Sequence, residues 1–141
     1  MITRETIYAA LFAKVRGAAD FTSASRHYGR HIVSSAELPS LVMQQMGEVP
    51  DRPRLGASVV WTLQVSLRIA ACSTDVYVEP TTVLNPLVDA VEAALAPLSS
   101  SGVQDLGLPE LVQNTHISGR VVFETNDNQV TAIIPVEVLC I

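Results

Sequence analysis

Apolar residues recur at two different spacings along the chain, and the spacing distinguishes predicted helices from predicted strands. The first predicted helix covers residues 3–17, with Thr3 as its N-cap and Gly17 at its end. One face of this helix collects its apolar side chains, which are Ile7, Tyr8, Leu11, Phe12 and Val15. We expect this face to pack against the rest of the protein.

The second predicted helix covers residues 85–97. Asn85 can cap free N–H groups, and Pro86 then occupies the first helical position, where its missing N–H costs nothing. Asp89 and Glu92 lie outside the apolar stripe of this helix, so we expect both carboxylates on its outer surface. The stripe itself consists of Leu84, Leu87, Val88, Val91, Ala94, Leu95 and Leu98.

A period of two over residues 58–72 predicts the clearest strand of the protein. This segment is longer than a typical strand, so we expect part of it to project past the core. Its apolar face carries Val59, Trp61, Leu63, Val65, Leu67, Ile69 and Ala71.

Three further strands are predicted. Residues 38–48 form one, placed near a sheet edge because Pro39 cannot donate a hydrogen bond to a ladder. His116–Glu124 and Gln129–Ile141 form an antiparallel pair joined by a polar turn at residues 125–128.

The connecting segments complete the predicted order. Residues 18–37 form a loop that leads into a short strand around residues 30–34, and residues 99–110 form a second loop. Residues 47–57 contain two prolines, two glycines and four charged residues, which predicts an exposed, mobile turn. The order is helix, strand, strand, helix, strand, strand. It predicts one α+β domain over residues 1–141, with an antiparallel or mixed sheet and both helices on one face.

The composition suggests that some apolar surface is covered by partners. Of the 141 residues, 48% are hydrophobic and only 16% are charged, which is a high apolar content for a free monomer. A well-filled core is the alternative reading. No window reaches the roughly 18 uninterrupted apolar residues of a membrane span, and the N-terminal residues lack the apolar segment of a signal peptide.

Two cysteines, Cys72 and Cys140, lie in separate apolar runs. We expect small buried side chains in a reducing compartment, and nothing in the sequence supports a disulfide between them.

Charge is divided unevenly between the halves of the chain. Residues 1–70 hold eight Lys or Arg against five Asp or Glu, whereas residues 71–141 hold one Arg against nine Asp or Glu. The halves of neighbouring copies could therefore attract one another head to tail, unless folding mixes the charges over one surface. The net charge of −5 argues against electrostatic binding of nucleic acid.

No catalytic or metal-binding motif stands out. The sequence has no phosphate loop, no dinucleotide fingerprint and no nucleophile elbow. His27 and His31 have the spacing of a helical metal pair, but Gly29 lies between them and no Glu or Cys completes a ligand set. Their neighbours Arg26 and Arg30 make an interaction patch the better interpretation.

Two other groupings have a simple structural interpretation. Ser99, Ser100 and Ser101 lie in a loop without a neighbouring base. Asp89 and Glu92 could act as an acid/base pair, but solvated charges on a helix are much commoner. We therefore expect a protein that is not an enzyme and has no cofactor or metal.

Four motifs spread over nearly the whole chain are shared with one known family. They are R-x-x-I-Y-A-A-L-F at residues 4–12, F-x-x-x-S-R at residues 21–26 before Leu38-Pro39, L-N-x-L-x-D-A-x-E-A-A-L at residues 84–95, and Leu106-Gly107 with I-S-G-R-V at residues 117–121 before A-I-I-P-V-E-V at residues 132–138. In these the chain resembles the tail terminator, or tail completion, proteins of long-tailed bacteriophages, of the minor tail protein U type.

The resemblance implies a structural protein of the virion, assembled in the cytoplasm of the host bacterium. Such proteins form rings, often hexameric, that cap the tail tube, end its polymerisation and offer a surface for joining to the head. The implied partners are further copies of the chain, the tail tube protein and the head–tail connector protein. DNA is expected to pass through the lumen without specific binding, and no membrane is involved.

The charged residues expected to make these contacts lie in three places: Arg26 and Arg30 in the first loop, Glu48, Asp51, Arg52 and Arg54 in the turn at residues 47–57, and Asp89 and Glu92 on the second helix. The turn is expected to order on the tail tube, and the helix carboxylates are within reach of a neighbouring basic patch. A neck connector or adaptor and a small ligand-binding domain are the alternative functions.

Overall fold

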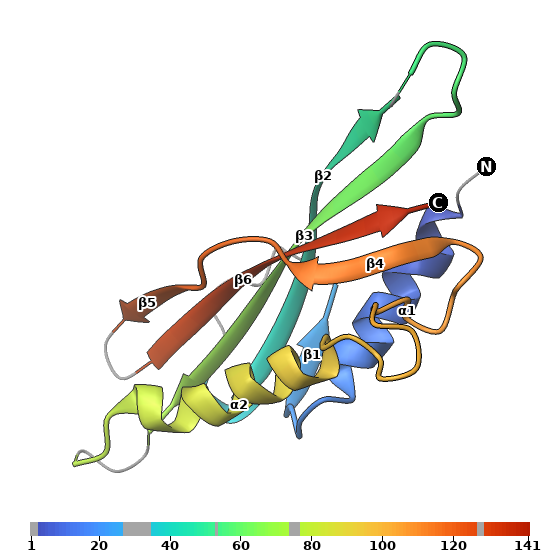
Figure 1. Cartoon of the computed structure of the whole chain (residues 1–141). Coiled ribbons are helices and arrows are strands. Elements are labelled where there is room, and N and C mark those ends of the chain that lie inside the picture. Colours follow the sequence, from blue (N-terminus) through green and yellow to red (C-terminus); the bar gives the residue numbers. More distant parts are fainter. Residues whose placement is uncertain (1–2, 27–34, 53, 74–76, 127–128) are drawn as a thin grey trace.

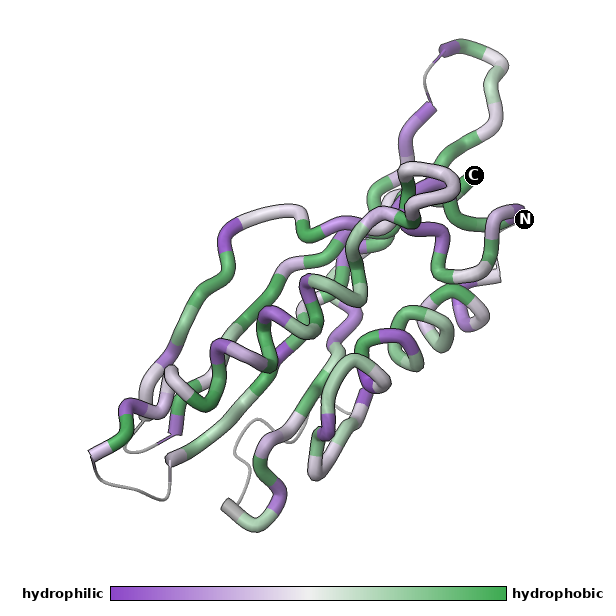
Figure 2. The backbone as a smooth tube through the Cα atoms, turned by 60° about the horizontal axis from the view of Figure 1, so that its bottom comes forward, coloured by the Kyte–Doolittle hydropathy of each residue, from purple (hydrophilic) through white to green (hydrophobic). Residues whose placement is uncertain are grey.

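The protein folds into one mixed sheet with two helices on one of its faces (Figures 1 and 2). The computed structural model describes residues 3–26, 35–52, 54–73, 77–126 and 129–141. The helices are α1 (Arg4–Arg16) and α2 (Pro80–Ala94), a short 3-10 turn η1 spans Ser35–Glu37, and the strands are β1 (Ser23–Ser25), β2 (Ser40–Asp51), β3 (Val60–Cys72), β4 (Val112–Ile117), β5 (Val122–Asn126) and β6 (Gln129–Cys140).

The strand order is β1-β2-β3-β6-β4, and β5 pairs with β6 beyond the end of β4. Only β1 and β2 are parallel among the described strand pairs. This arrangement confirms the predicted α+β class. It also confirms the helix predicted over residues 3–17, whose buried side chains are Ile7, Tyr8, Leu11 and Val15.

Helix α2 begins at Pro80, so the prediction that Asn85 caps it is wrong. Glu79 has an extended backbone and occupies the N-cap position, which places Pro80 in the first turn. Pro86 lies inside the helix and remains exposed. The helix continues through this proline because Leu84 and Val91 are fully buried against the sheet, so packing outweighs the local start signal.

The centre of the sheet is the antiparallel pair β3–β6, with partners from Thr62 opposite Leu139 to Cys72 opposite Gln129. The predicted alternation of β3 is confirmed, since its odd-numbered side chains from Leu63 to Ala71 are buried on the helix side. The even-numbered side chains of β6 meet them there, and together with α1 and α2 they form one core.

The strand predicted over residues 116–124 is in fact two strands, β4 and β5. Ile117 pairs with Val136 and Val122 pairs with Ile133, so four residues of the connection lie opposite only two residues of β6. One of those two is Pro135, which accepts a hydrogen bond from the N–H of Ser118 but has no N–H of its own to donate to the connection. The ladder breaks at this point.

The sheet edge near β2 also differs from the prediction. Strand β1, which the sequence did not reveal, pairs with the first three residues of β2. Beyond Val42 the outer edge of β2 has no further strand beside it among the described residues. Pro39 thus precedes β2 near an edge, as expected. The short strand predicted around residues 30–34 lies outside the described residues.

Strands β2 and β3 extend past the rest of the sheet as a two-stranded arm (Figure 1). Their pairing continues to Asp51 opposite Val60, whereas the pairing of β3 with β6 ends at Thr62. We call residues 49–61 the arm. The turn predicted over residues 47–57 is therefore too long, because its first five residues belong to β2. The expected projection of β3 past the core is confirmed.

A buried glutamine, Gln104, ends helix α2. Its side-chain Nε2 donates to the carbonyl oxygens of Ala94 at 3.3 Å and Ala96 at 2.8 Å, and its Oε1 accepts from the N–H of Leu106 at 3.1 Å. The Gln104 backbone N–H donates to Oδ1 of Asn114 in β4 at 3.0 Å. Helix α2 has no basic residue in its last turn, so this side chain supplies donors for its free carbonyl groups.

We predict that Gln104→Ala lowers the free energy of unfolding by about 3 kcal/mol, because two carbonyl groups and one N–H lose their buried partner. Gln113→Ala is the matched control, since Gln113 is an exposed glutamine of β4. Urea unfolding measures both variants. Equal losses would show that the Gln104 hydrogen bonds do not hold the end of α2.

Candidate interaction surfaces

Glu48, at the base of the arm, accepts hydrogen bonds from two residues of helix α1. Its Oε1 accepts a hydrogen bond from Nε of Arg4 at 2.5 Å, and its Oε2 accepts one from the hydroxyl of Tyr8 at 3.0 Å. The guanidinium group of Arg4 also lies 5.0 Å from the centre of the Trp61 ring in β3. Both strands of the arm are thus held at their base by the first two turns of one helix.

Arg26 links α1 to β2 through a second set of hydrogen bonds. Its guanidinium group donates to both carboxylate oxygens of Glu5, at 2.6 and 3.2 Å, and to the side-chain oxygen of Gln45 at 3.1 Å. The hydrogen bonds from Arg26 lower the pKa of Glu5 below its ordinary value. Arg26 and Glu48, which the sequence suggested as partner contacts, are therefore both engaged within the chain itself.

The tip of the arm, residues 52–57, presents an apolar side chain close in sequence to two cations. Leu55 is 99% exposed, and Arg52 and Arg54, which precede it in the chain, are exposed as well. The N–H of Ala57 donates to the carbonyl oxygen of Arg54, and Gly56 has a φ of 82°, which the third residue of a type II turn requires. Leu55 therefore occupies the apex of a defined turn.

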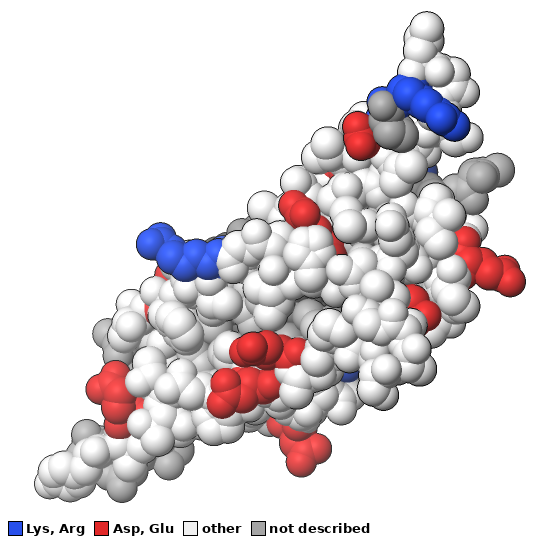
Figure 3. All heavy atoms as spheres, viewed as in Figure 1, with Lys and Arg blue, Asp and Glu red and all other residues white. Residues whose placement is uncertain are grey.

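Helix α2 carries the opposite charge. Asp89 and Glu92 are exposed, as predicted, and neither forms an ion pair with a described residue. Neither α2 nor β4 contains a Lys or Arg. Figure 3 shows acidic side chains gathered over α2, while cationic side chains appear at the arm and at the connection between β4 and β5.

A groove of about 290 Å³ runs between the end of α2 and β4, and we call it the α2–β4 groove. Glu92 lies on its helix side. The hydroxyl of Thr115, a residue 2% exposed, is buried without a hydrogen-bond partner among the described residues. The residues that line the groove are Glu92, Leu95, Ala96, Pro97, Asn114, Thr115, His116 and Ile117.

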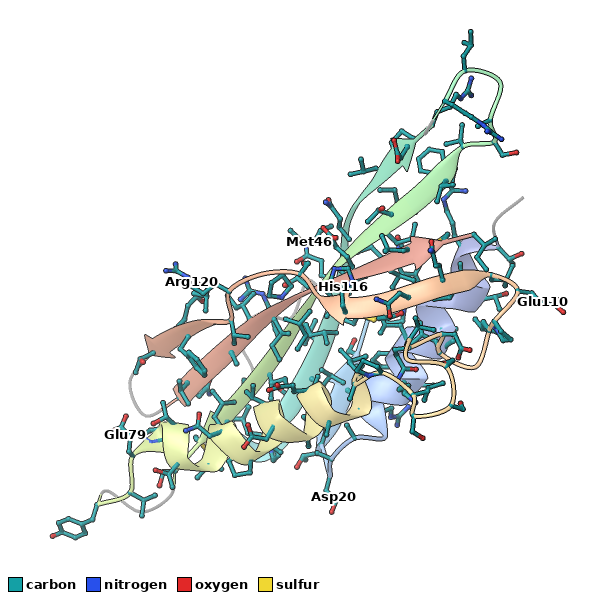
Figure 4. All side chains as sticks on the ribbon, viewed as in Figure 1. Asp20, Met46, Glu79, Glu110, His116 and Arg120 are labelled. Atoms are coloured by element: carbon teal, nitrogen blue, oxygen red, sulfur yellow. The ribbon has the colours of Figure 1, made fainter. Side chains whose placement is uncertain are left out.

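The face of the sheet away from the helices has a hollow of its own, about 350 Å³ in volume. Met46 of β2 and Arg120 of the β4–β5 connection lie at its rim, and Ile133 and Pro135 of β6 line it. Figure 4 shows Arg120 pointing outward from the connection. We call this the open-face hollow. Beside it, Nε2 of His116 lies 3.7 Å from a carboxylate oxygen of Glu137.

The residues predicted to make contacts thus separate into distinct groups. Asp51, Arg52 and Arg54 lie together at the end of the arm, far from Asp89 and Glu92 on α2 (Figure 1). Arg30, with His27 and His31, lies outside the described residues. The sequence did not reveal the α2–β4 groove, because its two walls come from segments that only the fold brings together. Leu55 could have been found from the prolines, glycines and charges that surround it.

The two cysteines are free and cannot bond within one chain. Cys72 pairs with Gln129 at one end of β6, whereas Cys140 lies at its other end, about 35 Å away at the rise of a strand. Burial raises the pKa of the Cys140 thiol. Among the described residues there is no cluster of three or more metal-ligating side chains, and no described helix is long and apolar enough to cross a membrane.

Comparison of the chain with models of known protein families finds no match, and comparison with curated proteins finds none.

The Tyr8–Glu48 contact predicts a loss of stability at alkaline pH. Burial, followed by the hydrogen bond to Glu48 and the charge of that carboxylate, raises the pKa of Tyr8 to about 12. An unfolded tyrosine releases its proton near pH 10, so the contribution of Tyr8 is complete below pH 10 and is lost between pH 10 and about 12.

Urea unfolding across this pH range tests the contact. The fall in unfolding free energy should be shallower in Tyr8→Phe than in the wild type, because phenylalanine has no proton to release. Tyr77→Phe is the control, since Tyr77 is 94% exposed, and it should follow the wild type. If Tyr8→Phe keeps the wild-type slope, Tyr8 does not carry the alkaline sensitivity.

Proposed function

We propose that this protein is a non-enzymatic structural protein that assembles head to tail into a closed ring, and that the ring is a tail terminator of a bacteriophage. In that role the ring caps the tail tube, ends its polymerisation and presents a joining surface to the head. Its partners are other copies of the chain, the tail tube protein and the head–tail connector protein, and its location is the virion.

The observation that carries the self-assembly part of this proposal is the separation of two complementary surfaces. The arm tip exposes Arg52 and Arg54 without an ion pair to any described acidic group, and α2 exposes Asp89 and Glu92 without one to any described cation. The two surfaces lie at different parts of the molecule (Figure 1), so one copy cannot satisfy both within itself. Contacts between unlike surfaces generate rings when the rotation closes.

The tail-terminator part rests on the four sequence motifs. Three of them fall largely on helices and strands of the fold: the first motif is most of α1, the third covers the later turns of α2, and the closing segment of the last, residues 132–138, lies in β6. Residues that build the core therefore carry the resemblance. This supports a shared fold more directly than a shared partner.

Native mass spectrometry of the full-length protein tests the proposal. We expect a single closed oligomer, with a hexamer as the first candidate, and negative-stain electron microscopy should show a ring with a central opening. A protein that stays monomeric at high concentration and whose melting temperature rises with a small ligand would contradict the proposal and favour a ligand-binding domain. A ring that binds the head connector but leaves tube growth unaffected would favour a neck adaptor.

Reversing both arm cations tests whether the arm takes part in assembly. We expect the double variant Arg52→Glu/Arg54→Glu to weaken ring formation or tail joining about tenfold or more, because its charges then repel an acidic surface. Arg120→Glu is the control, since it reverses an exposed cation far from the arm. Sedimentation velocity measures the ring, and electron microscopy with tail tubes measures joining. Unchanged behaviour in both assays would remove the arm from the contact.

A further inference from the structure

We infer that the arm tip of one copy docks in the α2–β4 groove of the next copy, with Leu55 inserted beside Leu95 and with Arg54 or Arg52 facing Glu92. This inference rests on the proposed head-to-tail assembly. It replaces the expectation that the turn at residues 47–57 orders on the tail tube, and it names both halves of the contact between copies.

The arm tip presents one exposed apolar side chain, Leu55, on a preformed turn, and we call this side chain the knob. Leu55 is almost wholly exposed at the apex of a hydrogen-bonded turn, and an isolated leucine in this position gains nothing from the fold of its own chain. The arm is anchored at its base by Glu48, so the knob is carried on a supported hairpin. Binding by such an element loses less conformational freedom than binding by an unstructured loop.

The groove has the matching chemistry. Leu95, Pro97 and Ile117 give it apolar walls, and Glu92 places a carboxylate on its helix side. No Lys or Arg lies in α2 or β4 to compete for that carboxylate or to repel an incoming arginine. The negative charge of Asp51 offsets one of the two arginine charges on the arm, so the end of the arm keeps a net positive charge.

The groove also retains an unused hydrogen-bonding group. The hydroxyl of Thr115 is buried and has no partner within the described part of the chain. Buried polar side chains in folded proteins nearly always have a partner. Because this hydroxyl has less than 1 Å² of accessible surface, main-chain groups of the turn at residues 54–57 would reach it only if the groove opens as Leu55 docks.

The geometry requires a second copy. The arm projects beyond the C-terminal end of β6, and the groove lies on the body of the protein beside α2, so the two face different directions (Figures 1 and 4). Each copy therefore offers its knob to one neighbour and its groove to the other. This is a heterologous contact, which can propagate around a ring.

Disulfide trapping tests the pairing directly. In a Cys72→Ser background, the double variant Leu55→Cys/Ala96→Cys places one thiol at the arm apex and one at the exposed edge of the groove. Oxidation should produce a ladder of covalent oligomers up to the size of the ring in a denaturing gel. Neither single variant should produce a ladder.

The matched control pairs the same arm thiol with the other concave surface. Leu55→Cys/Arg120→Cys places the second thiol at the rim of the open-face hollow and should produce no ladder. A ladder from this pair instead of the first would overturn the groove assignment in favour of the hollow. A ring without a ladder from either pair would overturn the inference while leaving the proposed function intact, and a strict monomer would overturn both.

Two aspartate substitutions distinguish a specific role of Leu55 from a general effect of losing exposed apolar surface. Leu55→Asp should weaken assembly about 30-fold or more, as expected for a central apolar anchor. Tyr77→Asp introduces the same charge at another highly exposed apolar residue and should assemble as the wild type does. Arg52→Glu/Arg54→Glu should weaken assembly, and adding Glu92→Arg to this variant should restore part of it. Equal effects of the two aspartate substitutions, or no restoration, would contradict the inference.

Discussion

The antiparallel pairing of β3 with β6 is the constraint on which the rest of the structure depends. Its register keeps the odd residues of β3 and the even residues of β6 on the same side, where α1 and α2 cover them. A slip of one residue would turn every one of these apolar side chains to the opposite face. Strand β4 takes its place from the other edge of β6, so the groove beside α2 depends on the same register.

The arm follows from a difference in strand length. β2 and β3 continue to pair after β6 has ended, and a register shift between Gln45 and Gly47 marks the point where β2 leaves the core. A bulge of this kind bends a strand and increases its twist. An isolated two-stranded ribbon is marginally stable, and the bonds from Arg4 and Tyr8 to Glu48 provide the support that a third strand would otherwise give.

Local patterns were enough to predict part of this structure. The periodicity of α1, β3 and the α2 stripe follows from which side chains are buried, and a single segment contains that information. The start of α2 and the break between β4 and β5 could not be predicted from one segment. The first depends on the packing of Leu84 against the sheet, and the second depends on Pro135 of β6, which has no N–H to donate to the connection. The candidate site divides in the same way. The charges of the arm tip and of α2 were predictable, whereas the Arg4–Glu48 pair joins residues 44 positions apart and the groove joins two distant segments.

The two halves of the proposed contact depend on the fold to different degrees. Leu55 lies outside the core, so substitutions there change the surface without removing any packing that β3 and β6 require. The groove is built differently, since Gln104 binds the end of α2 and also reaches Asn114 of β4, and so sets the spacing of the two walls. Changes at Gln104 therefore affect stability and groove shape together. A defect in assembly without a defect in folding is expected from the arm and from the exposed Glu92, but not from Gln104, so the arm is a side of the contact that can change its partner at little cost to the fold.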